Sequence, residues 1–334
     1  MRLETLPPPP PPPIPKPKPS PSPPKDDEID VVRVSSNLVV VPVSVTDTTG
    51  RPTSGLLAAD FQLQEQGRTQ EIAQIGDPEQ VPLEIALLVD VSGSVNARFD
   101  FERESASRFL QQVLRAGDRA AIFAIDQEPR LEQGLSTAAH TTSKLMSINP
   151  AKSATAFYDT VIEAARYLAK SAPSEHRRVI LVISDGEDNF SDKVKQLIGN
   201  TRGEQNSATP QSRRLLHHRM LVEVQRELQK ADAAFYSINP SGPGLRLNMI
   251  SQRAQDGMEQ LATSTGGTSF VPGQLDDLDA VFRQIAAELR SQYLLQYYSK
   301  SEASSGTFLP IGVQVPKRLD LRVRARQGYY VKRK

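Results

Sequence analysis

The chain has 334 residues, of which 38% are hydrophobic and 24% charged, and its formal net charge is +1. This balance excludes a global field that would favour nucleic acid or an anionic membrane, and the absence of cysteine excludes disulfides, thiolate metal sites and cysteine nucleophiles. No window approaches the roughly 20 apolar residues of a membrane span, and the first residues, MRLETL, lack the basic and apolar regions of a signal peptide. The chain is therefore expected to be cytosolic, or to be exported by a targeting segment upstream of this start.

The first segment, residues 1–28, is dominated by proline, and its residues 7–25 read PPPPPPPIPKPKPSPSPPK. Proline fixes φ and removes hydrogen-bond donors, so we predict an extended polyproline II spacer without a core. A proline-rich docking ligand is the alternative. The segment resembles the Pro-Lys spacers that hold bacterial envelope proteins away from an anchor, which favours an exported protein in the periplasm, at the cell surface or outside the cell.

Residues 29–80 alternate apolar and polar side chains, as in NLVVVPVSVTD, DFQLQEQG and RTQEIAQIG, which predicts short strands of an antiparallel sheet. The same period returns in residues 291–334, where QYLLQYYS, TFLPIGVQV, RLDLRVRA and GYYVK are rich in Tyr and Val. Because the first group alone would make a thin domain, we predict that the two groups pair into one discontinuous β-sandwich.

Between these groups, residues 81–290 alternate apolar strands with amphipathic helices. The runs LEIALLVDV and RRVILVISD are continuously apolar, as expected for parallel strands that are covered on both faces. Ala106, Phe109, Leu110 and Val113 have the i, i+3, i+4, i+7 spacing of one helix face. This rhythm predicts an α/β fold with a Rossmann-like, mostly parallel sheet flanked by helices and inserted in the sandwich. Further strands are expected at 118–126, 233–240 and 268–272, a short helix around Lys144, and further helices at 156–171, 219–231, 257–266 and 275–291.

Small oxygen-bearing side chains follow two of the apolar strands. Asp90, Ser92 and Ser94 come directly after one strand, in DVSGSV, and Asp185 follows the other, in VISDGEDN. Thr155 lies in the loop that opens the helix preceding the second strand. Ligands of an open α/β sheet bind outside the carboxyl ends of its strands. We therefore expect the three loops to bring these oxygens towards one crevice.

Several kinds of site compete for this crevice. A phosphate-binding P-loop needs several glycines and a Lys-Ser/Thr pair, whereas DVSGSV has one glycine and no lysine nearby. A serine nucleophile needs a histidine base, and none of the histidines is placed near a strand end: His140, His176, His217 and His218. A hard divalent cation fits better, because Mg²⁺ prefers oxygen ligands and keeps waters. Helix capping by the serines and the threonine is the plainer alternative.

The pattern Asp-x-Ser-x-Ser at Asp90, Ser92 and Ser94, followed by Thr155 and then Asp185, resembles the metal-ion-dependent adhesion site of von Willebrand factor type A domains. The resemblance implies a Rossmann-like fold and a metal site built from these residues. The ion in that family is usually Mg²⁺, with Mn²⁺ or Ca²⁺ as alternatives here, and an acidic residue of a protein partner often supplies the last ligand. The resemblance implies no enzymatic activity.

The flanking strands carry a narrower resemblance. NLVVVPVSVTDTTGRPTSGLLAADFQLQEQGRTQEI, before the α/β region, and YLLQYYS and RVRARQGYY, after it, are similar to bacterial VWFA-related proteins found mainly in acidobacteria. The leading hypothesis is a metal-dependent protein-binding module of the cell envelope or exterior. One alternative is a cytosolic subunit that docks an ATPase, as in metal chelatases. Another is a metal-dependent hydrolase, against which the lack of a placed general base speaks.

A long connection, residues 189–218, follows on the same rim as the predicted site. Its candidate partner contacts are basic side chains: Arg213, Arg214, His217 and His218. A solvated surface excursion with a short helix is the alternative. Glu187 and Asp188 are interpreted as solvated rim residues and not as further ligands.

Overall fold

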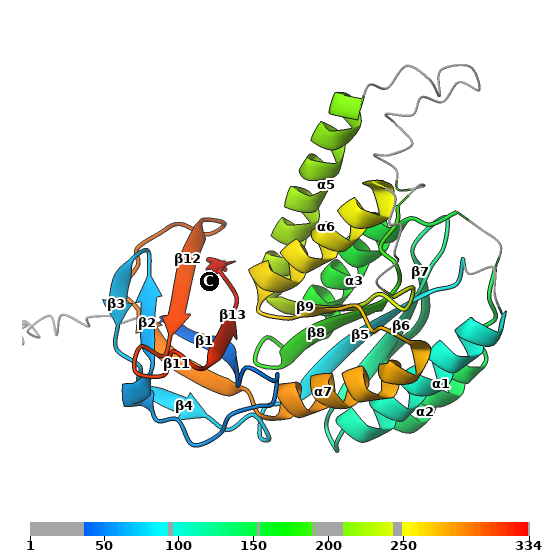
Figure 1. Cartoon of the computed structure of the whole chain (residues 1–334). Helices are drawn as coiled ribbons and strands as arrows, with labels where there is room; N and C mark the ends of the chain where they lie inside the picture. Colours follow the sequence, from blue (N-terminus) through cyan, green and yellow to red (C-terminus); the bar gives the residue numbers. More distant parts are fainter. Residues whose placement is uncertain are drawn as a thin grey trace, which may run out of the picture. The chain divides into compact units, whose positions relative to one another are not determined.

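The structure, a computed structural model, describes residues 37–92, 96–151, 154–188, 191, 210–242 and 249–332. Several predictions lie at least partly outside these residues: the proline-rich spacer, the first residues of the 29–80 region, the role of Ser94, and most of the 189–218 connection, including the side chains of Arg213 and Arg214. Figure 1 shows the described elements, with helices on both faces of a central sheet and the antiparallel strands beside it.

Within the described residues, a six-stranded sheet forms the centre of the α/β region, in the order β10-β9-β8-β5-β6-β7. Neighbouring strands pair in parallel except at one edge, where β7 runs antiparallel to β6. The predicted mostly parallel sheet is confirmed, but β7 is a strand that the sequence did not predict. The strands are β5 (Leu83–Asp90), β6 (Arg119–Ile125), β7 (Arg130–Ser136), β8 (Arg177–Ile183), β9 (Ala233–Ile238) and β10 (Ser269–Phe270).

Helices cover both faces of this sheet (Figure 1). One face packs against α1 (Asn96–Val113), α2 (Ala138–Met146) and α7 (Leu278–Arg290). The other packs against α3 (Phe157–Ser171), α5 (Pro210–Ala231) and α6 (Met249–Thr265). Both α5 and α6 begin earlier than predicted, so α5 includes the end of the predicted 189–218 connection.

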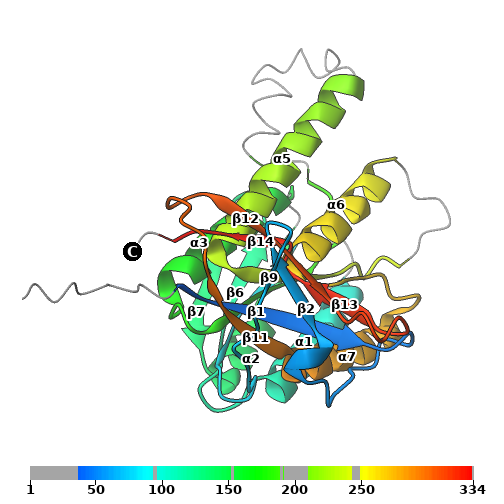
Figure 2. The ribbon, with the colours of Figure 1, turned by 90° about the vertical axis from the view of Figure 1, so that its left-hand side faces the viewer.

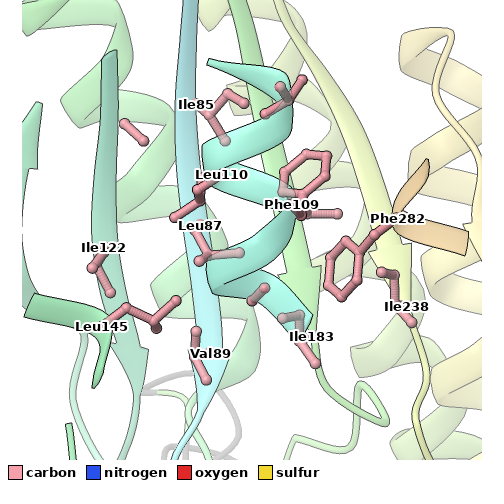
Figure 3. Close-up of a cluster of buried hydrophobic side chains, with 14 of the residues drawn as sticks. Ile85, Leu87, Val89, Phe109, Leu110, Ile122, Leu145, Ile183, Ile238 and Phe282 are labelled. Atoms are coloured by element: carbon pink, nitrogen blue, oxygen red, sulfur yellow. The ribbon is translucent and has the colours of Figure 1, made fainter. Parts of the chain in front are cut away.

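Burial on both faces explains the unbroken apolar run of β5. Ile85, Leu87 and Val89 belong to one core with Phe109 of α1 and Phe282 of α7 (Figure 3). The alternate residues of the strand belong to the second core, on the α3 side. Removing such a side chain from water contributes about 1.5–3 kcal/mol. The strand is thereby fixed in the middle of the sheet, and its last residue, the predicted site aspartate, has a fixed position.

Strands from both ends of the chain form two antiparallel sheets, in the orders β13-β1-β11-β4 and β14-β12-β2-β3. The pairing of β1 with β11 runs from Asn37 opposite Ser299 to Val43 opposite Tyr293. Both sheets contribute to one core, and Figure 2 shows these strands on the side facing the viewer. The predicted fold class is confirmed. The elements are β1 (Asn37–Thr46), η1 (Ala58–Asp60), β2 (Gln62–Glu65), β3 (Arg68–Gln70), β4 (Gln74–Gly76), β11 (Tyr293–Ser299), β12 (Phe308–Gln314), β13 (Arg322–Ala325) and β14 (Gly328–Tyr330), while η2 (Leu275–Asp277) directly precedes α7 in the α/β region.

Candidate metal centre

The carboxylate of Asp90 is the centre of a hydroxyl network at the carboxyl end of β5. Its Oδ1 accepts hydrogen bonds from the Ser92 amide, at 3.0 Å, and from the Ser92 hydroxyl, at 2.6 Å. Its Oδ2 accepts a hydrogen bond from the Ser184 hydroxyl at 2.8 Å. Each hydroxyl group donates its hydrogen bond to the carboxylate. The lone pairs of the hydroxyl oxygen therefore stay available for a cation or for a further hydrogen-bond donor.

Ser184 was not predicted as a site residue. It follows the last residue of β8, and the register pairs Val89 with Ile183, which places Ser184 beside Asp90. Its hydroxyl oxygen also accepts a hydrogen bond from the Gly186 amide at 3.0 Å.

The turn after β8 requires a glycine at position 186. Gly186 has a φ of +75°, and a Cβ there would lie 2.8 Å from the Met258 sulfur. An L side chain would therefore be strained both by the backbone conformation and by this contact. Within the same turn, Oδ1 of Asp185 accepts a hydrogen bond from the Glu187 amide at 3.0 Å. The glycine thus fixes the path of the chain around Asp185.

Thr155 lies in a loop that two backbone hydrogen bonds hold at the ends of β5 and β6. The Ala151 amide donates to the Val91 carbonyl at 2.6 Å, and the Ala156 amide donates to the Asp126 carbonyl at 2.8 Å. Thr155 itself is buried, with 6% exposure. Loops from three segments therefore meet at this edge of the sheet, and within them Asp90 and Ser92 are in direct contact.

The chemistry of the donors at this edge suits a hard cation, because they are carboxylate and hydroxyl oxygens. Within the described segments, no group of three or more histidine or acidic side chains could hold a metal. A cation bound here would consequently depend on serine and threonine oxygens as well as on Asp90 and Asp185.

Comparison with known families identifies the α/β region. The family model of the von Willebrand factor type A domain matches residues 85–187. The chain carries a von Willebrand factor type A (VWA) domain. The match includes all the predicted metal ligands, while the wider boundaries of 81–290 and the similarity to acidobacterial proteins stay predictions. No curated protein matches the chain.

Solved structures resemble the VWA domain at low identity. The PilB minor pilin from Streptococcus sanguinis is 14% identical over 67% of this chain and 64% of that one, with a TM-score of 0.47. The vWF domain of the type V pili tip protein Mfa5 from Porphyromonas gingivalis is 15% identical over 62% and 94%, with a TM-score of 0.44. Proximal thread matrix protein 1 from the mussel byssus, with a zinc-occupied MIDAS motif, is 15% identical over 66% and 48%, with a TM-score of 0.44.

The side chain of Asp188 has a different environment from the one predicted. Its Oδ2 accepts hydrogen bonds from the Tyr158 amide, at 2.8 Å, and from the Ser191 hydroxyl, at 2.5 Å, while its Oδ1 accepts from the Ser191 amide at 3.0 Å. Asp188 is thus not a solvated rim residue, because it ties this loop to the first turn of α3. Glu187 is also engaged, since it accepts a hydrogen bond from the Ser251 hydroxyl at 2.5 Å.

His217, one of the predicted partner contacts, lies against α3. Its Nδ1 is 2.8 Å from the Tyr158 hydroxyl, and burial lowers the pKa of the imidazole. Burial likewise raises the pKa of Tyr158, so the phenol stays protonated and can donate to a neutral His217. Across the described residues, none of the helices combines the length and hydrophobicity needed to cross a bilayer.

Proposed function

We propose that the VWA domain binds a divalent cation and uses it to bind an acidic group of a partner protein. Mg²⁺ is the expected ion, with Mn²⁺ or Ca²⁺ as alternatives. The proposed ligands, direct or through water, are Asp90, Ser92, Ser94, Thr155 and Asp185. The observation that carries the proposal is the pair of hydroxyl groups, from Ser92 and Ser184, that donate to the Asp90 carboxylate.

The charge of this donor set supports an acidic partner. Two carboxylates face a divalent ion, and the remaining donors are neutral hydroxyl groups. Some of these contacts run through water, since Mg²⁺ usually keeps several waters. An ion held in this way retains positive field at its open position, and a carboxylate from another protein can replace a water there. No step of bond cleavage is needed, so the proposed activity is binding and not catalysis.

The cation is tested by calorimetry and by thermal unfolding of the wild type and of Asp90→Asn. At a Mg²⁺ concentration one hundred times its dissociation constant, binding stabilises the folded state by about 2.7 kcal/mol. For a chain of this size we expect a rise in the melting temperature of roughly 5 °C. Asp90→Asn should abolish this rise, because the amide keeps the shape of the side chain and loses its charge.

Asp126→Asn is the matched control. Asp126 follows the adjacent strand β6, and its carboxylate accepts hydrogen bonds from Arg130 and from the Gln127 amide. It belongs to no hydroxyl network among the described hydrogen bonds, so this variant should keep the response to Mg²⁺. If the wild type and Asp90→Asn respond equally, the hydroxyl groups at this edge serve only the loops and helix ends, and the metal site is refuted.

The partner is tested by capture on the immobilised full chain from the periplasmic and extracellular fractions of the native organism. We expect capture in Mg²⁺, loss of capture in a chelator, and loss in Asp90→Asn. A peptide rich in glutamate should compete, whereas its glutamine counterpart should not. If the chelator does not change capture, binding of the partner does not depend on the metal, and this part of the proposal is refuted. Export itself is part of the proposal, and its support is the proline-rich segment.

A further inference from the structure

A second polar site lies at the other end of the strands of the central sheet, near the start of β8. A cavity of about 240 Å³ is lined there by residues of the α/β region, including Arg178 and Gln229, and by residues of the antiparallel sheets, including Val40 and Arg326. Arg178 belongs to the start of β8, whereas the predicted cation site lies beyond the end of that strand. The cavity is therefore separate from the proposed cation site.

Three buried N–H groups of the cavity lining have no acceptor among the described residues: Nε of Arg178, Nε of Arg326 and Nε2 of Gln229. The three residues are only 6%, 9% and 7% exposed. A buried donor without a partner costs about 1–3 kcal/mol, and such groups in native proteins usually meet a bound water, ion or ligand.

The two guanidinium groups are held in place by their other nitrogens. Arg178 donates from Nη1 to the Ala231 carbonyl at 3.0 Å and from Nη2 to the Ala172 carbonyl at 3.0 Å. Arg326 donates from Nη2 to the Val40 carbonyl at 2.9 Å and from Nη1 to the Asp232 carboxylate. Their orientation is thus fixed without a ligand, and a ligand would meet preformed donors.

Positive charge exceeds negative charge around these donors. The cavity lining holds three arginines and two carboxylates: Arg177, Arg178, Arg326, Glu175 and Asp232. Asp232 pairs with Arg326, and the negative charges of Glu84 and Glu175 act on Arg178, but Glu84 is itself paired with Arg119. Desolvation, and then the positive charges of Arg178 and Arg326, lower the pKa of Lys332 nearby. Water could accept the free N–H groups, but it would leave this excess of charge uncompensated.

We propose that the cavity binds a small oxyanion, through a phosphate, sulfate or carboxylate group that accepts hydrogen bonds from Arg178, Arg326 and Gln229. A cavity of about 240 Å³ has room for such a group together with several waters, each of which takes roughly 30 Å³ in the liquid. Because the donors come from the α/β region and from the antiparallel sheets, the anion would join the two parts. This site does not depend on the proposed cation site.

Calorimetric titration of anions into the full chain tests this proposal. Inorganic phosphate, sulfate and acetate are each titrated in a chloride buffer without divalent cations. We expect saturable binding at one site per chain. Gln229→Leu removes one donor to a charged acceptor and should weaken binding at least about 10-fold. Gln229→Glu places a carboxylate in the cavity, so it should abolish anion binding and raise the melting temperature of the anion-free protein. Comparison of the three anions shows whether phosphate, sulfate or carboxylate is preferred.

Gln70→Glu is the control for the change in net charge, since Gln70 lies on β3 and is not among the cavity-lining residues. This variant should bind anions as the wild type does. The proposal is overturned if no anion gives saturable heat, which would mean that water alone fills the cavity, or if Gln229→Glu binds as tightly as the wild type. Should Gln229→Leu fail to fold, Gln229→Glu and a crystal structure with selenate, read by anomalous density in the cavity, decide the question.

Discussion

Glu288, near the end of α7, is expected to be among the most sensitive charged positions of the chain. Its Oε1 accepts a hydrogen bond from the Tyr236 hydroxyl at 2.8 Å, and its Oε2 accepts one from Arg324 of β13. Glu288 is 1% exposed. Burial, and then the negative charge of Glu288, raise the pKa of Tyr236, so its hydroxyl stays protonated and donates. This carboxylate therefore joins α7, the last helix of the α/β region, to the antiparallel strand β13.

The substitution Glu288→Gln tests this network with little change in shape. Breaking a fully buried ion pair by neutralising one partner costs about 3–5 kcal/mol. The Arg324 side chain is 25% exposed, so water partly replaces the lost charge, and we expect a loss of about 2–3 kcal/mol. Urea unfolding of the full chain, followed by circular dichroism, gives this quantity from the shift of the midpoint at an unchanged slope.

Glu79→Gln is the control for Glu288→Gln. Glu79 pairs with Arg115, but the two side chains are 58% and 48% exposed. An exposed pair contributes only about 0–1 kcal/mol, so the control should shift the midpoint little. Equal losses in the two variants would contradict the assignment of the Glu288 pair as a buried connection. In the double variant Glu288→Gln/Arg324→Met, part of the loss should be recovered, because no unpaired charge remains.

Other substitutions test the cores and the pH response. Leu87→Ala removes a fully buried side chain of β5, and its expected cost in urea unfolding is about 2–5 kcal/mol. Tyr297→Phe removes a hydroxyl that donates to the buried Glu65 at 2.5 Å, and it should lower the free energy of unfolding by about 1–3 kcal/mol. The control Tyr298→Phe changes a residue that is 52% exposed and should lower it by almost nothing. Similar losses in the two variants would refute the Glu65 contact. Burial lowers the pKa of His217, so the unfolded chain binds more protons below about pH 6.5 and stability should fall as the pH falls through this range. His217→Gln should make the urea midpoint less dependent on pH, and an unchanged dependence would show that His217 is not its source.

The central sheet could be predicted from the sequence because its inner strands are continuous apolar runs. β5 and β8 are buried along almost their whole length. β7, in contrast, reads RLEQGLS, and its residues are exposed or half-buried, so it has neither an apolar run nor a period of two. The early start of α5 was missed for a similar reason, since its first residues include PQSRR and give no apolar face. Edge strands and helix ends depend on neighbours that no local pattern specifies.

Part of the candidate site could also be predicted, because Asp90 and Ser92 are two residues apart and their contact is local. Ser184 could not be found in this way. Its hydrogen bond to Asp90 joins residues 94 apart in sequence and follows from the pairing of β5 with β8. Asp188 was misinterpreted for the same reason, since its contact with the Tyr158 amide depends on where α3 begins. The motif thus indicates the ligands, and the register of the sheet determines their neighbours.

The strand β8 connects the two proposed sites. Arg178 at its start lines the cavity, and Ser184 after its end donates to Asp90. Six steps of about 3.3 Å along a strand separate them by about 20 Å. A divalent cation and a divalent anion at this distance attract each other by about 3 kcal/mol at an effective dielectric constant of about 20. Salt at about 0.15 M, where the Debye length is about 8 Å, reduces this attraction to below about 1 kcal/mol.

In about 0.15 M salt we therefore expect Mg²⁺ and sulfate to stabilise the chain almost independently. The rise in melting temperature with both present should equal the sum of the separate rises to within about 2 °C, the equivalent of roughly 1 kcal/mol. The general stabilising effect of sulfate on proteins is measured with Gln229→Glu and subtracted. At this ionic strength a larger departure from additivity cannot come from direct attraction between the ions. It would mean that one ligand moves an element that the other site uses, and α7 is the first to examine, because Glu288 ties this helix to β13 beside the cavity wall.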